Sequence, residues 1–100
     1  MVPVEVQLLP QGPSTAVRSS VTGTASSVTL LQSNGLRKGA TIWNDSTTRL
    51  FIALGEGATT TSFTARLNPQ DYYEVPYGYT GVITGIWQVA NGSARITELT

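Results

Sequence analysis

The sequence has no cysteine and no histidine, and only six basic and six acidic side chains in 100 residues. Without cysteine there can be neither a disulfide nor a thiolate metal site. Without histidine the chain lacks the commonest metal ligand and the commonest general base. A single domain of this length buries about 60–65% of the surface that its unfolded chain exposes, so its margin of stability is thin. We therefore expect oligomerisation to supply part of the stability.

The charges balance to a formal net charge of +0 at pH 7, and no run exceeds two like charges. Binding to nucleic acid through counterion release, or to an anionic membrane surface, needs clustered cations. No apolar run approaches the roughly 18 residues that a membrane-spanning helix requires. The first residues also lack the basic and apolar regions of a secretory signal. The sequence therefore predicts neither a nucleic-acid partner nor a membrane segment.

The sequence contains some residue types that can serve in catalysis or ligand binding, but their spacing does not fit either role. Asp71 and Glu74 fall on opposite faces of a predicted strand, so they cannot form a carboxylate pair in one cleft. Lys38 is the only lysine and has no spacing relation to a serine. Residues 44–46 lack the acidic spacing of a calcium loop, and residues 55–57 lack the helix of a phosphate cradle. We predict no enzyme, and no catalytic, cofactor-binding or metal site.

The first 27 residues differ in composition from the rest. The stretch 10–27 (PQGPSTAVRSSVTGTASS) has too few large apolar groups to offset its own ordering entropy. It could be a flexible tail, or an extended arm that orders against a neighbouring subunit. Alternation over the first eight residues is typical of a strand and favours an arm with a docking strand. We predict an N-terminal arm over residues 1–27 whose partner-binding residues are Val2, Val4, Val6 and Leu8.

Residues 28–100 show strand signals throughout. Thr and Val are abundant, and no apolar stripe persists at helical spacing. The predicted strands cover residues 28–31, 40–44, 48–54, 62–67, 71–75, 80–84, 86–90 and 94–99. Seven or eight short strands separated by frequent turn signals predict an all-β domain, either a single antiparallel β-sandwich or a jelly-roll-like small barrel.

Three local features sharpen this prediction. Asn91-Gly92 favours a two-residue type I′ hairpin that would pair Trp87 with Ile96. Gly85 suggests a bulge or a bend between two strands. Alternation places Phe63 on the buried face of its strand.

Six of the eight aromatic residues are Tyr or Trp, and four Tyr lie within residues 72–79 (YYEVPYGY). Exposed Tyr and Trp offer large, rigid contact areas that suit protein interfaces and sugar platforms. Tyr77 and Tyr79 flank Gly78 in a predicted loop, so we expect both to be exposed and to bind a partner. Trp87 is more typical of a core residue.

Several motifs then point to a known kind of module. These are GATIWNDS (39–46), LFIALG (50–55), YYEVP (72–76), YTG (79–81) and GIW (85–87). They resemble a small β-sandwich module of tailed-bacteriophage virion proteins, of the capsid decoration (cement), head-fibre or tail accessory type. The resemblance covers about residues 36–99 and leaves out the arm.

The resemblance and the missing catalytic residue types together give a hypothesis of function. They imply a virion structural protein, made in the host bacterial cytoplasm, that decorates and stabilises a phage capsid. Its partner would be the major capsid protein or another virion protein, and the resemblance implies a homotrimer. The alternative is a fibre or tail module that binds a receptor or glycan through exposed aromatics such as Tyr77 and Tyr79.

Overall fold

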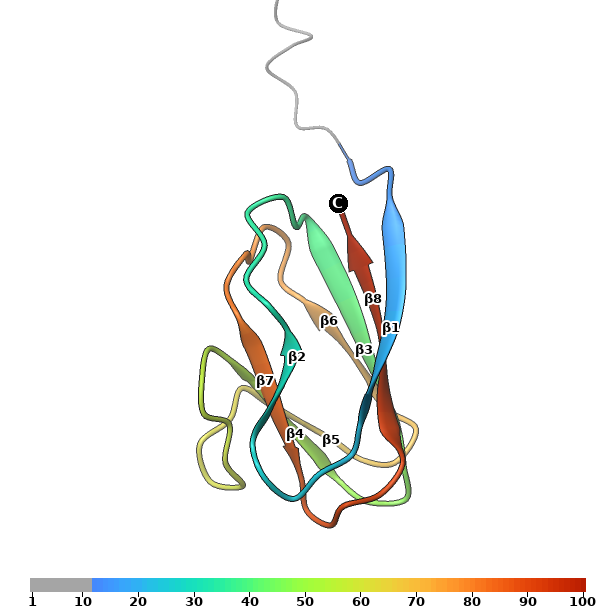
Figure 1. Cartoon of the computed structure of the whole chain (residues 1–100), viewed down its shortest axis with the longest axis vertical. Coiled ribbons are helices and arrows are strands. Elements are labelled where there is room, and N and C mark those ends of the chain that lie inside the picture. Colours follow the sequence, from blue (N-terminus) through green and yellow to red (C-terminus); the bar gives the residue numbers. More distant parts are fainter. Residues whose placement is uncertain (1–11) are drawn as a thin grey trace, which may run out of the picture.

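The computed structural model describes residues 12–100 and contains eight strands in two antiparallel sheets that pack face to face (Figure 1). One sheet has the strand order β1-β8-β3-β6, and the other has the order β2-β7-β4-β5. The described residues contain no helix. The strands are β1 (Ala16–Thr22), β2 (Val28–Leu31), β3 (Gly39–Asp45), β4 (Leu50–Leu54), β5 (Ala65–Leu67), β6 (Tyr72–Val75), β7 (Ile83–Trp87) and β8 (Ser93–Leu99).

The chain crosses from one sheet to the other at every connection except that between β4 and β5. Eight strands wound in this order form a jelly roll. The predicted all-β class and sandwich architecture are therefore confirmed, and the jelly-roll form is the one adopted.

The predicted Asn91-Gly92 hairpin is wrong, because β7 and β8 belong to different sheets. Gly92 does adopt a positive φ of 57°. However, Asn91 Oδ1 accepts hydrogen bonds from the backbone N–H and the hydroxyl of Thr47, at 2.8 and 3.1 Å. Gly23 N–H donates to the carbonyl oxygen of Gly92 at 2.8 Å. Asn91 and Gly92, which in many proteins form a tight hairpin, in this protein join three loops at one end of the sandwich.

Gly85 lies within the single strand β7 and does not separate two strands. A Cβ atom at this position would lie 2.8 Å from Leu30 Cδ1 and 3.2 Å from Leu50 Cδ1. Glycine therefore leaves room for the side chains of Leu30 and Leu50, which come from the two strands, β2 and β4, that flank β7 in the same sheet. Its neighbour Trp87 is fully buried, as expected for a core residue. The core between the sheets consists mainly of Leu30, Ala40, Ile42, Leu50, Ile52, Ile83, Trp87, Ala94 and Ile96.

Phe63 is 41% exposed, which contradicts its predicted place in the core. The predicted strand 62–67 is shortened to β5, and Phe63 instead packs edge-on against Phe51, with ring centroids 5.0 Å apart. The loop before it is anchored by Thr84, whose hydroxyl donates to the carbonyl oxygen of Gly55 at 2.7 Å and accepts from Ala58 N–H at 3.1 Å. The β4–β5 loop thus covers part of the outer surface of the β2-β7-β4-β5 sheet.

The predicted boundary between arm and sandwich at residue 28 also needs correction. Residues 16–22 form β1, which pairs with β8 along its whole length, from Ala16–Leu99 to Thr22–Ser93. Almost every β1 side chain is exposed, so its backbone hydrogen bonds, and not apolar burial, place it in the sheet. Amino-acid composition alone does not reveal a strand of this kind, because it contains few apolar residues. The candidate residues Val2, Val4, Val6 and Leu8 lie outside the described residues.

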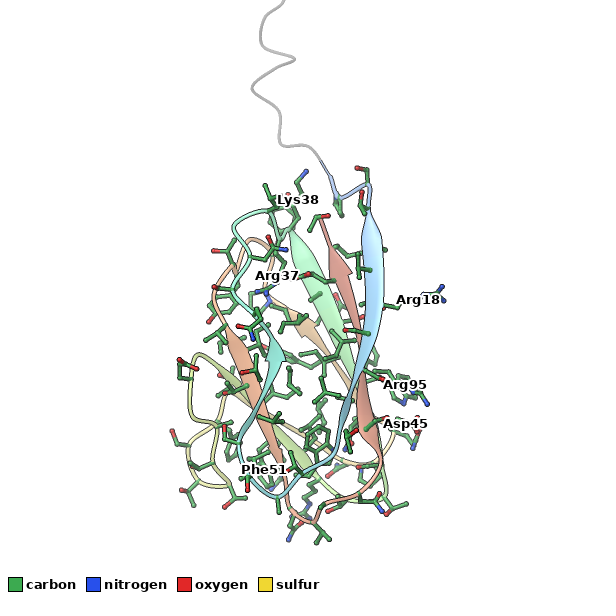
Figure 2. The ribbon with its side chains drawn as sticks, viewed as in Figure 1. Arg18, Arg37, Lys38, Asp45, Phe51 and Arg95 are labelled. Carbon is green, nitrogen blue, oxygen red and sulfur yellow. The ribbon has the colours of Figure 1, made fainter. Side chains whose placement is uncertain are left out.

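One end of the sandwich is held together by a buried cation, Arg37 (Figure 2). Its Nε donates to Glu98 Oε2 at 2.8 Å. Its Nη1 donates to the carbonyl oxygens of Tyr79 and Gly81, at 3.2 and 2.7 Å, and its Nη2 donates to that of Gln32. Arg37 therefore joins the β2–β3 loop, the β6–β7 loop and strand β8.

The opposite end is organised by Asn44, which is fully buried at the β3–β4 corner. Its Nδ2 lies 2.8 Å from the carbonyl oxygen of Thr48 and 3.1 Å from those of Leu67 and Asn68. Its Oδ1 accepts from the Ser46 hydroxyl at 2.7 Å. The turn after β3 is thus part of a wider hydrogen-bonded corner.

We predict that Arg37→Met lowers the free energy of unfolding by about 3–5 kcal/mol, because Glu98 and three carbonyl groups lose their buried partner. The exposed Arg66 provides the control, and Arg66→Met should change stability by less than about 0.5 kcal/mol. Urea denaturation followed by circular dichroism measures both. Equal stabilities for the two variants would contradict the role given to Arg37.

We predict that Asn44→Ala costs about 2–3 kcal/mol, because it leaves buried carbonyl groups unsatisfied. Asn34 makes one Asx hydrogen bond in an exposed loop, from Leu36 N–H to its Oδ1 at 3.0 Å. Asn34→Ala should therefore cost less than about 1 kcal/mol. A ranking in which Asn34→Ala is the more damaging variant in thermal unfolding would refute this account.

Candidate binding face

The outer surface of the β1-β8-β3-β6 sheet, called here the outer face, presents side chains in rows across the strands. Successive side chains of a strand point to opposite faces of the sheet. Trp43 therefore points outward, because its neighbours Ile42 and Asn44 are buried. The register then aligns outward residues of successive strands. One row contains Ser20, Arg95, Trp43 and Tyr72, and the next contains Arg18, Thr97, Thr41 and Glu74.

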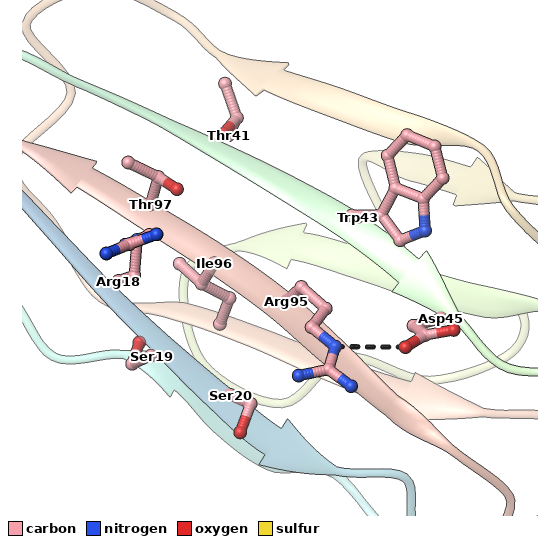
Figure 3. Close-up of a pocket in the computed structure, with 9 residues that line it drawn as sticks. All are labelled: Arg18, Ser19, Ser20, Thr41, Trp43, Asp45, Arg95, Ile96 and Thr97. Atoms are coloured by element: carbon pink, nitrogen blue, oxygen red, sulfur yellow. Dashed lines mark hydrogen bonds and ion pairs between the residues drawn. The ribbon is translucent and has the colours of Figure 1, made fainter.

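A shallow hollow of about 770 Å³ lies on the outer face over β1, β8 and β3 (Figure 3). It is lined by Arg18, Ser19, Ser20, Thr41, Trp43, Asp45, Arg95, Ile96 and Thr97. Tyr72 and Glu74, on β6, are not among the lining residues. The hollow therefore lies on the β8 side of Trp43.

Trp43 forms one wall of this hollow and is held in place by two neighbours. Its ring stacks on that of Tyr72, with centroids 6.3 Å apart and planes 9° from parallel. Its Nε1 donates to Gln70 Oε1 at 3.2 Å. The side chain remains 42% exposed. A large aromatic surface is thus presented to solvent in a fixed orientation.

The residues that line the hollow carry one net positive charge, because they include two arginines, Arg18 and Arg95, and one carboxylate, Asp45. Arg95 Nε donates to Asp45 Oδ2 at 2.9 Å (Figure 3). Within residues 12–100 Arg18 has no ion-pair partner. Thr41, Thr97 and Ser20 add hydroxyl groups that no other described residue engages.

The predicted tyrosines lie elsewhere, in the β6–β7 loop. Tyr77 is 67% exposed, as expected. Tyr79 is half-buried: its ring packs against the core, and its hydroxyl donates to the carbonyl oxygen of Val82 at 2.9 Å. The expectation that Tyr79 is exposed is therefore wrong. Loop position predicts exposure only on average, and here the loop folds inward around Arg37.

Sequence reasoning did not single out Trp43, Arg18 or Arg95 as candidate site residues. Alternation along residues 39–45 indicates that Trp43 lies opposite Ile42, but it does not say which strands lie beside it. Arg18 and Arg95 are far apart in the chain and line the same hollow only because β1 pairs with β8. The strand order was needed to bring them to one hollow.

Ionisable groups elsewhere have structural roles. Asp71 Oδ2 accepts from Asn68 N–H at 3.1 Å and closes the turn before β6. Burial raises the pKa of the Tyr73 hydroxyl above its ordinary value of 10.0. Within residues 12–100 no group of three or more acidic residues is placed to hold a metal ion. In the same range no helix is long and apolar enough to cross a membrane.

Comparison with known proteins found no match to a family model, a curated protein or a solved structure. The resemblance to virion modules therefore stays a prediction, and the function has to be argued from the described surfaces.

We predict that iodide quenches the fluorescence of Trp43 but not that of Trp87, because only the former is exposed. Trp43→Phe should abolish quenching and leave the emission of a buried indole. Tyr77→Phe, at the end of the sandwich, should leave quenching unchanged. Full quenching in Trp43→Phe would show that Trp87 is accessible and that the packing described here is wrong.

Proposed function

We propose that this protein is a virion structural protein that decorates and stabilises a phage capsid through protein–protein contacts, with the major capsid protein or another virion protein as its partner. The motif resemblance suggests this role, and the jelly-roll topology suits it because capsid domains commonly have this fold. A fold hosts many functions, so the proposal depends on the surface described next.

The observation that carries the proposal is a docking end, defined here as the β2–β3 loop, the β6–β7 loop and residues 12–15. Leu36, at 76%, and Tyr77 are the most exposed large hydrophobic residues among those described. Asn34 N–H donates to the carbonyl oxygen of Thr80 at 2.8 Å, and Gly78 N–H donates to that of Lys38 at 3.0 Å, so the two loops lie side by side.

The described chain also begins at the docking end (Figure 1). Lys38 Nζ donates to the carbonyl oxygen of Gly12 at 3.3 Å, and Thr100 N–H donates to that of Thr15 at 2.9 Å. Gly12 and Thr15, which follow the alternating apolar segment 2–9 in the sequence, therefore lie at the same end as the exposed Leu36 and Tyr77. An apolar anchor and apolar contact residues at one end suit attachment to a protein shell.

The exposed edge of β1 supports assembly into oligomers. β1 is the last strand of its sheet, so one of its edges has no strand partner among the described residues. Such an edge can accept a strand from another chain through backbone hydrogen bonds. This is where the predicted arm strand of a second subunit could bind in the proposed homotrimer.

The geometry does not favour the alternative in which Tyr77 and Tyr79 form a receptor or glycan platform. The Tyr79 hydroxyl is engaged with Val82, and its ring contacts the core. One exposed tyrosine remains at that end, which suits a protein contact better than a stacked sugar.

The test is binding of the purified protein to undecorated capsid shells, measured by co-sedimentation. Deletion of residues 1–11 should abolish attachment while the protein still melts cooperatively. The deletion must stop before residue 16, because β1 belongs to the sheet. Attachment at full strength after this deletion would refute the arm as an anchor.

Point variants in the full chain test the docking end separately. Leu36→Ser with Tyr77→Ser should weaken shell binding by roughly tenfold or more, since buried anchors dominate interface energies. Val89 provides the control, because it is also a well-exposed apolar residue, at 61%, but lies in the β7–β8 loop at the opposite end. If Val89→Ser weakens binding and the double variant does not, the docking end has been assigned to the wrong loops.

A further inference from the structure

We propose that the hollow on the outer face binds an acidic sugar, that is, a pyranose unit bearing a carboxylate within a surface polysaccharide. This proposal is independent of capsid decoration, because the hollow lies on a sheet face and not at the docking end. Its parts are an aromatic wall, a pair of guanidinium groups and a floor of hydroxyl groups.

The aromatic wall is Trp43. Sugars present apolar C–H faces that pack on flat rings, and Trp combines such a surface with a polar N–H. Tyr72 covers one side of the indole, and Gln70 holds its N–H, so the side toward β8 is the one available to a ligand. Because the ring is already oriented, binding would not need to order it.

The guanidinium groups select the charge of the ligand. Arg95 uses Nε to bind Asp45, which leaves its terminal NH₂ groups without a described partner. Arg18 stands on the neighbouring strand without an ion pair in residues 12–100. Arginine binds carboxylates through paired, charge-assisted hydrogen bonds. Asp45 both orients Arg95 and leaves an excess of one positive charge, which matches one carboxylate per sugar unit.

The floor supplies neutral hydrogen-bonding groups. The hydroxyls come from Thr41 on β3, Thr97 on β8 and Ser20 on β1, and Thr97 lies between Thr41 and Arg18 in its row (Figure 3). Ring hydroxyls of a sugar can exchange hydrogen bonds with these groups.

The composition of the hollow favours a sugar over other anions. A nucleic acid would need several phosphate-binding cations along a track, and only two arginines are present. A protein partner would need an apolar centre, whereas Arg95 and Thr97 of β8 lie at the centre here. Glu74, beside Thr41 in the same row, would also repel a ligand carrying several charges on that side.

The test uses the full chain with two acidic probes, oligogalacturonate and oligosialic acid, each compared with its methyl-esterified form. Titration followed by Trp fluorescence and calorimetry should show binding to at least one acidic probe. Methyl esterification should weaken it by about tenfold or more, as for a lost charge-assisted pair. Absence of binding to both acidic probes, or equal binding of acid and ester, would overturn the proposal.

Variants then assign the residues. Trp43→Ala should abolish binding to the acidic probe. Arg18→Gln should weaken binding of the acidic probe by at least about tenfold and leave the weak binding of the methyl ester unchanged. Tyr77→Ala, at the docking end, should bind as the parent does. Unchanged binding by Trp43→Ala would refute the site.

Two further measurements separate this proposal from capsid decoration. Trp43→Ala should attach to capsid shells normally, and the shell-binding variant Leu36→Ser with Tyr77→Ser should bind the acidic sugar normally. If Trp43→Ala instead dissociates an oligomer in sedimentation, the outer face is an interface between copies and the sugar site is wrong.

Discussion

The buried guanidinium of Arg37 is the interaction on which the arrangement of one end of the protein depends. A charge removed from water is tolerated only when it is fully paired. Here the partners are the Glu98 carboxylate and carbonyl groups of the two neighbouring loops. Arg37 therefore fixes both loops against β8 in one geometry. Leu36 and Tyr77 lie in these two loops, and their side chains are exposed although the loops themselves are held in place.

The rest of the molecule follows from how the two sheets use their surfaces. Asn44 closes the far end by binding three carbonyl groups from two segments, Thr48 and the consecutive Leu67 and Asn68. The β4–β5 loop covers part of one sheet through Thr84, whereas the hollow of the other sheet stays open. Two separate surfaces result, an apolar end and a polar aromatic face. Because the two surfaces are separate, a substitution in one need not disturb the other, so the two proposed binding sites can be tested independently.

Much of the secondary structure could be predicted because short strands leave local signals. Alternation in residues 40–44 and 71–75 marks β3 and β6, and Trp87 is a core residue as expected. The failures have a common cause. Asn91-Gly92, Gly85 and Phe63 were interpreted through local rules, but their roles depend on segments distant in sequence, namely Thr47, Leu30 and Phe51. β1 was missed because a polar edge strand is held by backbone hydrogen bonds, which composition does not record.

The sequence by itself determined the all-β class, the lack of cysteine and histidine chemistry, and the exposure of Tyr77. These properties depend on composition and on alternation between neighbouring residues. Only the tertiary structure decided which residues form a surface together. Arg18, Arg95 and Trp43 line one hollow because β8 lies between β1 and β3, and Tyr79 is half-buried because its loop folds around Arg37. Strand order and the pairing of a buried charge are long-range properties, so no local pattern encodes them.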